Sequence, residues 1–213
     1  MSVRVGLTGG LASGKSTVAQ MFAARGAQMM YADQVAHDLM QPGTSVYEQV
    51  VRTFGSSIIR SDRTIDRPKL AQIAFGEHRI EELNRIVHPA VSARMEQWLA
   101  EMSLSHPRGV LVFEAALILE AGIGKHFDKI VVVSSRPEQK LERFAGRLLS
   151  DDQLDERRRA EALREAERRI GVQLSETEKI AAADYVIDNS GTVEQTERQV
   201  GRIFKELKKL AQG

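Results

Sequence analysis

The chain has 213 residues, of which 42% are hydrophobic and 28% charged, a balance typical of a folded globular protein rather than a disordered chain. Its 30 Lys and Arg residues nearly match its 29 Asp and Glu residues, so the net charge of +1 gives no basic surface for wrapping nucleic acid. The absence of cysteine excludes disulfides, thiolate metal sites and thiol nucleophiles.

The apolar segments are too short to span a membrane. The longest runs, such as residues 110–113 and 130–133, fall far short of the roughly 20 residues that a bilayer span needs. Residues 1–8 carry Arg4 and lead into a glycine cluster and Lys15, unlike the apolar region of a signal peptide. We therefore expect a cytoplasmic protein that binds no membrane and no nucleic acid, and that acts on small molecules.

Five short segments rich in β-branched and apolar residues predict strands that are buried on both faces. They are residues 3–8, 28–31, 110–113, 130–134 and 185–187. Between them the apolar residues follow a helical period, as in residues 16–25, where Val18, Met21 and Phe22 share one face before Gly26 ends the helix. This alternation predicts a three-layer α/β fold with a five-stranded parallel sheet.

Two segments interrupt the alternation. Residues 33–107 contain several helical patterns without a clear buried strand, which indicates an inserted helical subdomain. Residues 151–169 interleave acids and bases at the spacing of helical ion pairs, which predicts an exposed, charged helix. We expect one domain, whose parts are a core of about residues 1–32, 108–147 and 178–213, an insert of about residues 33–107 and a lid of about residues 148–177.

The pattern G-x-x-x-x-G-K-[ST] occurs between the first predicted strand and the first predicted helix, which is the context that this phosphate-binding motif requires. The residues of the loop are Gly9, Gly10, Leu11, Ala12, Ser13, Gly14, Lys15, Ser16 and Thr17. Glycines let the backbone curl until its N–H groups point inward at the positive end of the helix, and such a nest binds a triphosphate. Lys15 is expected to reach the β- and γ-phosphates of ATP, Ser16 to bind the Mg²⁺ that bridges them, and Thr17 to extend the cradle.

The rest of the chain distinguishes between the enzymes that use such a loop. A GTP-dependent switch needs an N-K-x-D segment after a late strand, which this sequence lacks, and the D-x-x-G segment from Asp188 to Gly191 comes too late. A kinase needs an acceptor-binding insert and a cationic lid that exclude water, and residues 33–107 and 148–177 are candidates for both. The sequence therefore favours a phosphotransferase.

Four further side chains are candidates for this chemistry, beside Lys15. Asp33 follows the second predicted strand, where it can cap a helix or orient the acceptor hydroxyl and take its proton. Glu114 ends the third predicted strand, where it can act near Mg²⁺ or be a buried, paired structural acid. Arg143 and Arg147 lie four residues apart on one helix face and can clamp the phosphoryl group or the adenine end of ATP, or form surface salt bridges. We expect Lys15, Asp33 and Arg143 to carry the transfer.

Several short motifs accompany the phosphate-binding loop in a fixed order. They are Leu7-Thr8-Gly9-Gly10, Ser13 to Thr17, Ala32-Asp33, Pro42-Gly43, Phe54-Gly55, Ile65-Asp66-Arg67 with Leu70, His88-Pro89, Leu141 with Arg143, and Ala183 to Gly191. In this order they resemble the dephospho-coenzyme A kinase family, and the resemblance covers almost the entire chain. It implies that the protein uses ATP to phosphorylate the ribose 3′-hydroxyl of dephospho-coenzyme A, the last step of coenzyme A synthesis. The alternatives are another small-acceptor kinase, of the nucleoside monophosphate or shikimate type, and a regulatory ATP-binding protein.

The resemblance also bears on single residues. It supports the catalytic role of Asp33 and a place near the acceptor for His88, which Pro89 alternatively marks as a helix end. Arg67 is expected to bind a phosphate of the acceptor or to form a structural ion pair, and Asn189 to meet the adenine edge or to form a turn. The lid arginine that contacts ATP is expected among Arg157, Arg158, Arg159, Arg168 and Arg169.

Overall fold

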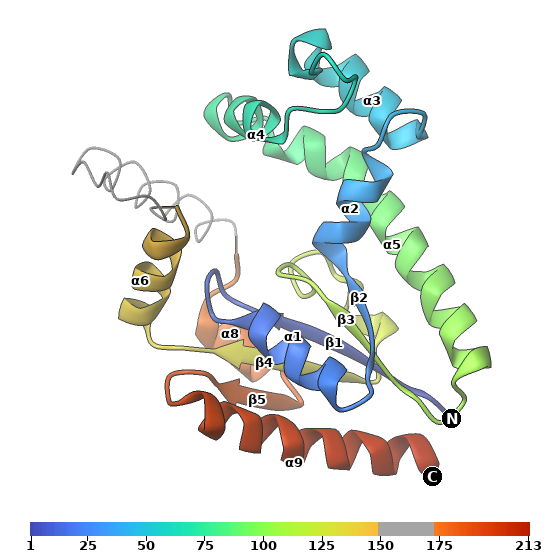
Figure 1. Cartoon of the computed structure of the whole chain (residues 1–213), viewed down its shortest axis with the longest axis vertical. Helices are drawn as coiled ribbons and strands as arrows, with labels where there is room; N and C mark the ends of the chain where they lie inside the picture. Colours follow the sequence, from blue (N-terminus) through green and yellow to red (C-terminus); the bar gives the residue numbers. More distant parts are fainter. Residues whose placement is uncertain (149–172) are drawn as a thin grey trace. The chain divides into compact units, whose positions relative to one another are not determined.

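The computed structural model describes residues 1–148 and 173–213 (Figure 1). The chain forms two compact units, one made of Met1–Met29 with Leu99–Gly213 and the other of Met30–Trp98, and each is described by itself. None of the helices within the described ranges combines the length and the apolar character that a membrane span requires.

The first unit is built on a sheet whose strands occur in the order β2-β3-β1-β4-β5. The strands are β1 (Val3–Gly9), β2 (Gln28–Tyr31), β3 (Val110–Glu114), β4 (Lys129–Ser134) and β5 (Tyr185–Asp188). Strand β1 pairs in parallel with β3 and with β4, and β4 pairs in parallel with β5. The predicted α/β fold with a five-stranded parallel sheet is confirmed, and the strand bounds match the predicted ranges or extend them by a single residue.

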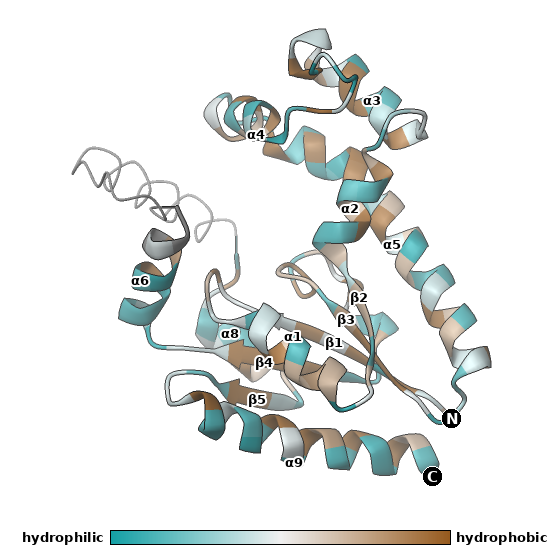
Figure 2. Cartoon of the chain, viewed as in Figure 1, coloured by the Kyte–Doolittle hydropathy of each residue, from teal (hydrophilic) through white to brown (hydrophobic). Residues whose placement is uncertain are grey.

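Helices on the sheet explain why the central parts of its strands are apolar. Helices α1 (Lys15–Ala24) and α9 (Val193–Gln212) pack against each other and both contact β1, while α8 (Glu176–Ala181) packs against β4. Central residues such as Val5, Leu111 and Val131 are fully buried. Figure 2 shows the strands mainly in brown and pale tones, whereas α6 (Pro137–Leu148) is mainly teal. A sheet covered in this way holds the ends of its strands rigidly, and the candidate site is built at those ends.

The second unit is helical and has a hydrophobic core of its own. Its elements are α2 (Ala32–Leu39), α3 (Ser45–Phe54), the 3₁₀ helix η1 (Ser56–Ile58), α4 (Arg67–Gly76) and the first part of α5 (Ile80–Ser105). Phe54, Ile58, Leu70 and Val87 are among the buried residues that pack together there. The helical patterns expected between residues 33 and 107 therefore form helices.

One expectation about this unit is wrong. The alternative that Pro89 marks a helix end at His88 is wrong, because α5 continues through both residues. The reason is burial on both sides of Pro89, since Val87, Met95 and Trp98 are at most 8% exposed. The packing of these side chains stabilises one continuous helix. This packing outweighs the local preference that Pro89 imposes on the residue before it.

Candidate active site

The phosphate-binding loop is a curled segment between β1 and α1. Ala12, with φ 53°, and Gly14, with φ 92°, have left-handed backbone angles that turn the chain into the helix. Gly14 is the N-cap of α1, and no side chain in the described ranges caps it. The N–H groups of Ser16 and Thr17 donate to no backbone carbonyl among the described residues. Such N–H groups at a helix N-terminus form an anion-binding site.

Lys15 brings its charge to the same loop. Its Nζ donates hydrogen bonds to the carbonyl oxygens of Gly9 at 3.0 Å and Gly10 at 3.1 Å. Ser16, the next residue, is exposed in the first turn of α1. An ammonium group, a hydroxyl group and unpaired peptide N–H groups thus occur together at one helix terminus, which is the chemistry that a phosphate chain and its counterion require.

Helix α6 supports the loop from the side. Phe144 packs against Ala12, and this contact stabilises a left-handed residue whose conformation costs about 1 kcal/mol without glycine. Arg143 donates from one guanidinium nitrogen to the carbonyl oxygen of Ser13 at 3.5 Å and from the other to that of Asn189 at 2.9 Å. The guanidinium therefore joins the loop to the segment after β5 and places a second cation beside it.

Asn189 follows β5 and contacts the loop directly. Its Nδ2 donates to the carbonyl oxygen of Ser13 at 2.9 Å, and its Oδ1 accepts a hydrogen bond from Thr196 Oγ1 at 2.9 Å. A Cβ atom on Gly14 would lie 2.0 Å from Asn189 Nδ2, so the close approach requires glycine there in addition to the positive φ. The contact between Asn189 and adenine stays a prediction, whereas the structure shows that Asn189 contacts the loop.

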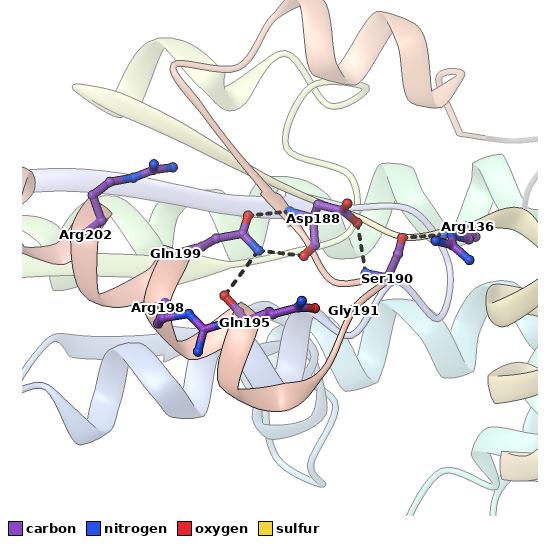
Figure 3. Close-up of a pocket in the computed structure, with 8 residues that line it drawn as sticks. All are labelled: Arg136, Asp188, Ser190, Gly191, Gln195, Arg198, Gln199 and Arg202. Carbon is purple, nitrogen blue, oxygen red and sulfur yellow. Dashed lines mark hydrogen bonds between the residues drawn. The ribbon is translucent and has the colours of Figure 1, made fainter.

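The segment that carries Asn189 is also fixed on its other side (Figure 3). The side-chain amide of Gln199 pairs with the backbone N–H and carbonyl groups of Asp188 at 3.0 and 2.8 Å. The N–H of Ser190 donates to Asp188 Oδ1 at 2.9 Å, and the N–H of Arg136 donates to Ser190 Oγ at 3.0 Å. The hydrogen bonds from Ser190 lower the pKa of the Asp188 carboxyl. These contacts hold the turn after β5 along the wall of a cavity of about 670 Å³.

A buried network connects the end of β1 to α8. Thr8 Oγ1 and Lys179 Nζ each donate to the carbonyl oxygen of Ala116 at 3.2 Å. Lys179 is only 1% exposed and forms a 2.9 Å ion pair with Glu120. Because Thr8 immediately precedes the loop, this network fixes the strand end from which the loop starts.

Glu114 lies next to the strand from which the loop starts, and Leu11, a residue of the loop, lines a second cavity. Glu114 is the last residue of β3, pairs in register with Leu7 of β1, and is 8% exposed. Its carboxylate therefore belongs to the sheet edge at which the loop begins. Leu11 and Gly10 line a cavity of about 270 Å³ together with residues of α6 and α8.

In the second unit, Asp33 and Arg67 each lie in the first turn of a helix. Helix α2 begins at Ala32 with Tyr31 as its N-cap, so the alternative that Asp33 is the N-cap is wrong, and its exposed carboxylate lies in the first turn. Arg67 opens α4, and its guanidinium lies 3.4 Å from His37 Nδ1. Among the described residues Arg67 forms no ion pair, so its exposed charge is available to an anion.

His88 lies on α5, beside a cavity of about 420 Å³. The cavity is lined by Glu81, Asn84, Arg85, His88 and Pro89. Burial of the imidazole lowers the pKa of His88, so the ring is neutral at pH 7. A neutral imidazole can donate one hydrogen bond and accept another, which suits a polar acceptor molecule.

Comparison with known proteins identifies the family. The family model of dephospho-CoA kinase matches residues 3–195. The chain belongs to the dephospho-CoA kinase family. It is 39% identical to the dephospho-CoA kinase of Aquifex aeolicus over 96% of this chain and 97% of that protein. It is 37% identical to that of Leifsonia xyli over 96% of this chain and 98% of that protein.

A solved structure of dephospho-CoA kinase from Campylobacter jejuni shares the fold. It is 22% identical to this chain, covers 98% of both chains and superposes with a TM-score of 0.67. The resemblance that the ordered motifs indicate is thereby confirmed, and it distinguishes the dephospho-CoA kinase family from the nucleoside monophosphate and shikimate types that the loop alone allows.

Some residues expected to serve a dephospho-CoA kinase are not described by the structure. Arg147 belongs to α6, but its side chain lies outside the described part. The charged helix expected at residues 151–169 and most of the lid expected at residues 148–177 also lie outside it. The same holds for the candidate lid arginines Arg157, Arg158, Arg159, Arg168 and Arg169.

Proposed function

We propose that this protein binds the phosphates of ATP in the loop from Gly9 to Thr17 and transfers the γ-phosphoryl group to the ribose 3′-hydroxyl of dephospho-CoA. The assignment of this reaction, which completes coenzyme A biosynthesis, rests on membership of the dephospho-CoA kinase family. The observation that carries the location is Lys15 Nζ bound to two loop carbonyls at the uncapped N-terminus of α1. A lysine and free N–H groups at one point supply what a phosphate chain needs.

The main task of this site is to stabilise charge on the γ-phosphoryl group. Phosphoryl transfer depends mostly on positioning and electrostatics, because its transition state is loose and its oxygens carry the charge. The ammonium group of Lys15 and the loop N–H groups bind the β- and γ-phosphate oxygens. Arg143, which is already fixed to Ser13 and Asn189, adds a guanidinium beside the loop and contacts ATP.

Asp33 addresses the acceptor. Its exposed carboxylate in the first turn of α2 can accept a hydrogen bond from the 3′-hydroxyl, orient the attacking oxygen and take the proton late in the transfer. We expect Asp33→Asn to keep the affinity for ATP and to lose most of the turnover. An unchanged kcat in this variant would remove Asp33 from the mechanism.

We assign binding of dephospho-CoA to the insert of residues 33–107. Arg67 offers an exposed guanidinium without an ion-pair partner among the described residues, which suits a phosphate of the acceptor. His88 offers a neutral imidazole beside a cavity. The balanced net charge of +1 supports small-molecule partners rather than nucleic acid, and we place the reaction in the cytoplasm.

Ser16 and Glu114 have the chemistry to hold Mg²⁺. Ser16 presents an exposed hydroxyl beside Lys15, and Glu114 presents a buried carboxylate at the carboxyl end of β3. Oxygen donors are what Mg²⁺ prefers, and one or two from the protein suffice because phosphates and waters complete its coordination. When bound, the ion neutralises phosphate charge.

Calorimetry with a non-hydrolysable ATP analogue and Mg²⁺ tests the phosphate site. We expect Lys15→Ala to lose most of the affinity for the analogue, while the control Lys125→Ala, at an exposed lysine, binds as the wild type does. ADP release should depend on dephospho-CoA and not on cytidylate, uridylate or shikimate. Unchanged binding by Lys15→Ala would refute the location of the site.

A further inference from the structure

We propose that Thr196 is a positioning residue for ATP, whose hydroxyl fixes the Asn189 amide so that this amide holds the phosphate-binding loop in shape. Thr196 is fully buried inside α9, seven residues along the chain from Asn189. The inference rests on the proposed phosphate site, because Thr196 is proposed to stabilise the loop that forms this site.

The hydrogen bonds around Asn189 determine which way its amide faces. The carbonyl oxygen of Ser13 can only accept, so the side-chain nitrogen of Asn189 must lie toward it, as the 2.9 Å contact shows. Its oxygen then faces Thr196 Oγ1, also at 2.9 Å. The Thr196 hydroxyl donates there, because its other acceptor, the carbonyl oxygen of Thr192, is farther away at 3.3 Å.

The bond to Ser13 sets the direction of a peptide group in the loop. In a trans peptide the N–H points opposite to the preceding carbonyl, so fixing the Ser13 carbonyl also fixes the N–H of Gly14. Asn189, in the segment after β5, and Arg143, on α6, both donate hydrogen bonds to this carbonyl. The Gly14 N–H is therefore turned away from that segment, and it is the last loop amide before α1 begins.

Loss of the Thr196 hydroxyl releases this arrangement. Without that donor, the oxygen of the half-buried Asn189 side chain loses its hydrogen bond from α9, and the amide is held only through its nitrogen. An amide held at one end only is less well oriented toward the Ser13 carbonyl, so one of the two lateral supports of the loop is weakened. The effect falls on ATP binding, since the segment that moves belongs to the phosphate site.

Steady-state kinetics of three variants test the proposal. Thr196→Val keeps the shape and removes the hydroxyl, Thr196→Ser keeps the hydroxyl, and Thr196→Ala provides a second removal in case the valine variant does not fold. We expect the valine and alanine variants to raise the KM for ATP and the Kd for its analogue about three- to tenfold. The KM for dephospho-CoA should change less than about twofold, and the serine variant should restore both constants for the nucleotide.

Two outcomes would overturn the proposal. One is an unchanged KM for ATP in a folded Thr196→Val or Thr196→Ala variant. The other is an equal rise in Thr196→Ser, which would assign the effect to packing rather than to the hydroxyl. If Lys15→Ala also leaves nucleotide binding intact, the phosphate site itself is wrong, whereas a strong Lys15 effect without a Thr196 effect removes only this inference.

Discussion

Lys179 Nζ lies 2.9 Å from Glu120 Oε1, although the lysine side chain is 1% exposed and the glutamate 14%. Two charges out of water are costly, and their attraction offsets that cost only when further hydrogen bonds satisfy them. Here the lysine also donates to the Ala116 carbonyl oxygen, and the backbone N–H of Leu174 donates to Glu120 Oε1 at 2.9 Å. The pair is therefore part of the support at the end of β1.

Removing one partner of this pair should be strongly destabilising. We expect Lys179→Met to lower the free energy of unfolding by about 3 kcal/mol, because it leaves the largely buried Glu120 carboxylate with no cation among the described residues. Urea unfolding measures the change. Lys129 is the matched control, since its 2.8 Å pair with Asp184 is one-third exposed, and Lys129→Met should cost at most about 1 kcal/mol. Equal losses at both lysines would contradict the importance of burial.

Alanine variants at Gly14 and Gly26 distinguish the effect of a steric clash from that of backbone strain. Both have φ 92°, but a Cβ atom would lie 2.0 Å from Asn189 Nδ2 at Gly14 and would have no atom within 4 Å at Gly26. Gly26→Ala should therefore cost about 1 kcal/mol of stability with nucleotide binding kept. Gly14→Ala should cost more and should abolish binding of the ATP analogue, because it displaces Asn189 from the loop. Calorimetric affinity and urea unfolding of the two variants check this, and similar affinities would refute the clash.

The sequence predicts the local features of this protein well and its long-range contacts poorly. The strands and the phosphate-binding loop follow from short-range patterns, since apolar runs and a glycine-lysine motif each lie within a few neighbouring residues. The bond between Asn189 and Ser13 joins positions 176 residues apart, and no local pattern indicates it. Lys179 was not predicted as a buried residue, because lysine is almost always exposed unless a partner such as Glu120 is supplied by the fold.

The place of Pro89 inside a helix could not be predicted from local sequence preference either. It lies inside α5, where it lacks the N–H that would bond to the preceding turn. Because a proline in a helix interior is about 3 kcal/mol less favourable than alanine, Pro89→Ala should raise the melting temperature. Differential scanning calorimetry measures this shift. A lower melting temperature would show that the helix is shaped around the proline.

The same variant separates stability from acceptor binding. Pro89 and His88 line the same cavity, so Pro89→Ala, which changes the wall of this cavity, should raise the KM for dephospho-CoA. The KM for ATP should stay unchanged, because the phosphate site belongs to the other unit. An altered KM for ATP alone would contradict the assignment of His88 to the acceptor.

Burial of His88 should make the stability of the protein depend on pH. Burial lowers the pKa of the folded imidazole below the 6.5 of an unfolded histidine. Below pH 6.5 the unfolded chain therefore binds a proton that the folded chain does not. As the pH is lowered from there, the free energy of unfolding decreases until the pKa of the folded state is passed. Above about pH 7.5 both states are neutral at this residue, and it contributes no pH dependence.

Urea unfolding of the wild type and of His88→Gln between about pH 7.5 and 5 measures this contribution. The loss of stability on acidification should be smaller in His88→Gln, since glutamine has no proton to bind in either state. His78→Gln provides the matched control, because it removes an exposed histidine of the same unit. If His88→Gln loses as much stability on acidification as the wild type, the His88 ring is not held in its neutral form by burial.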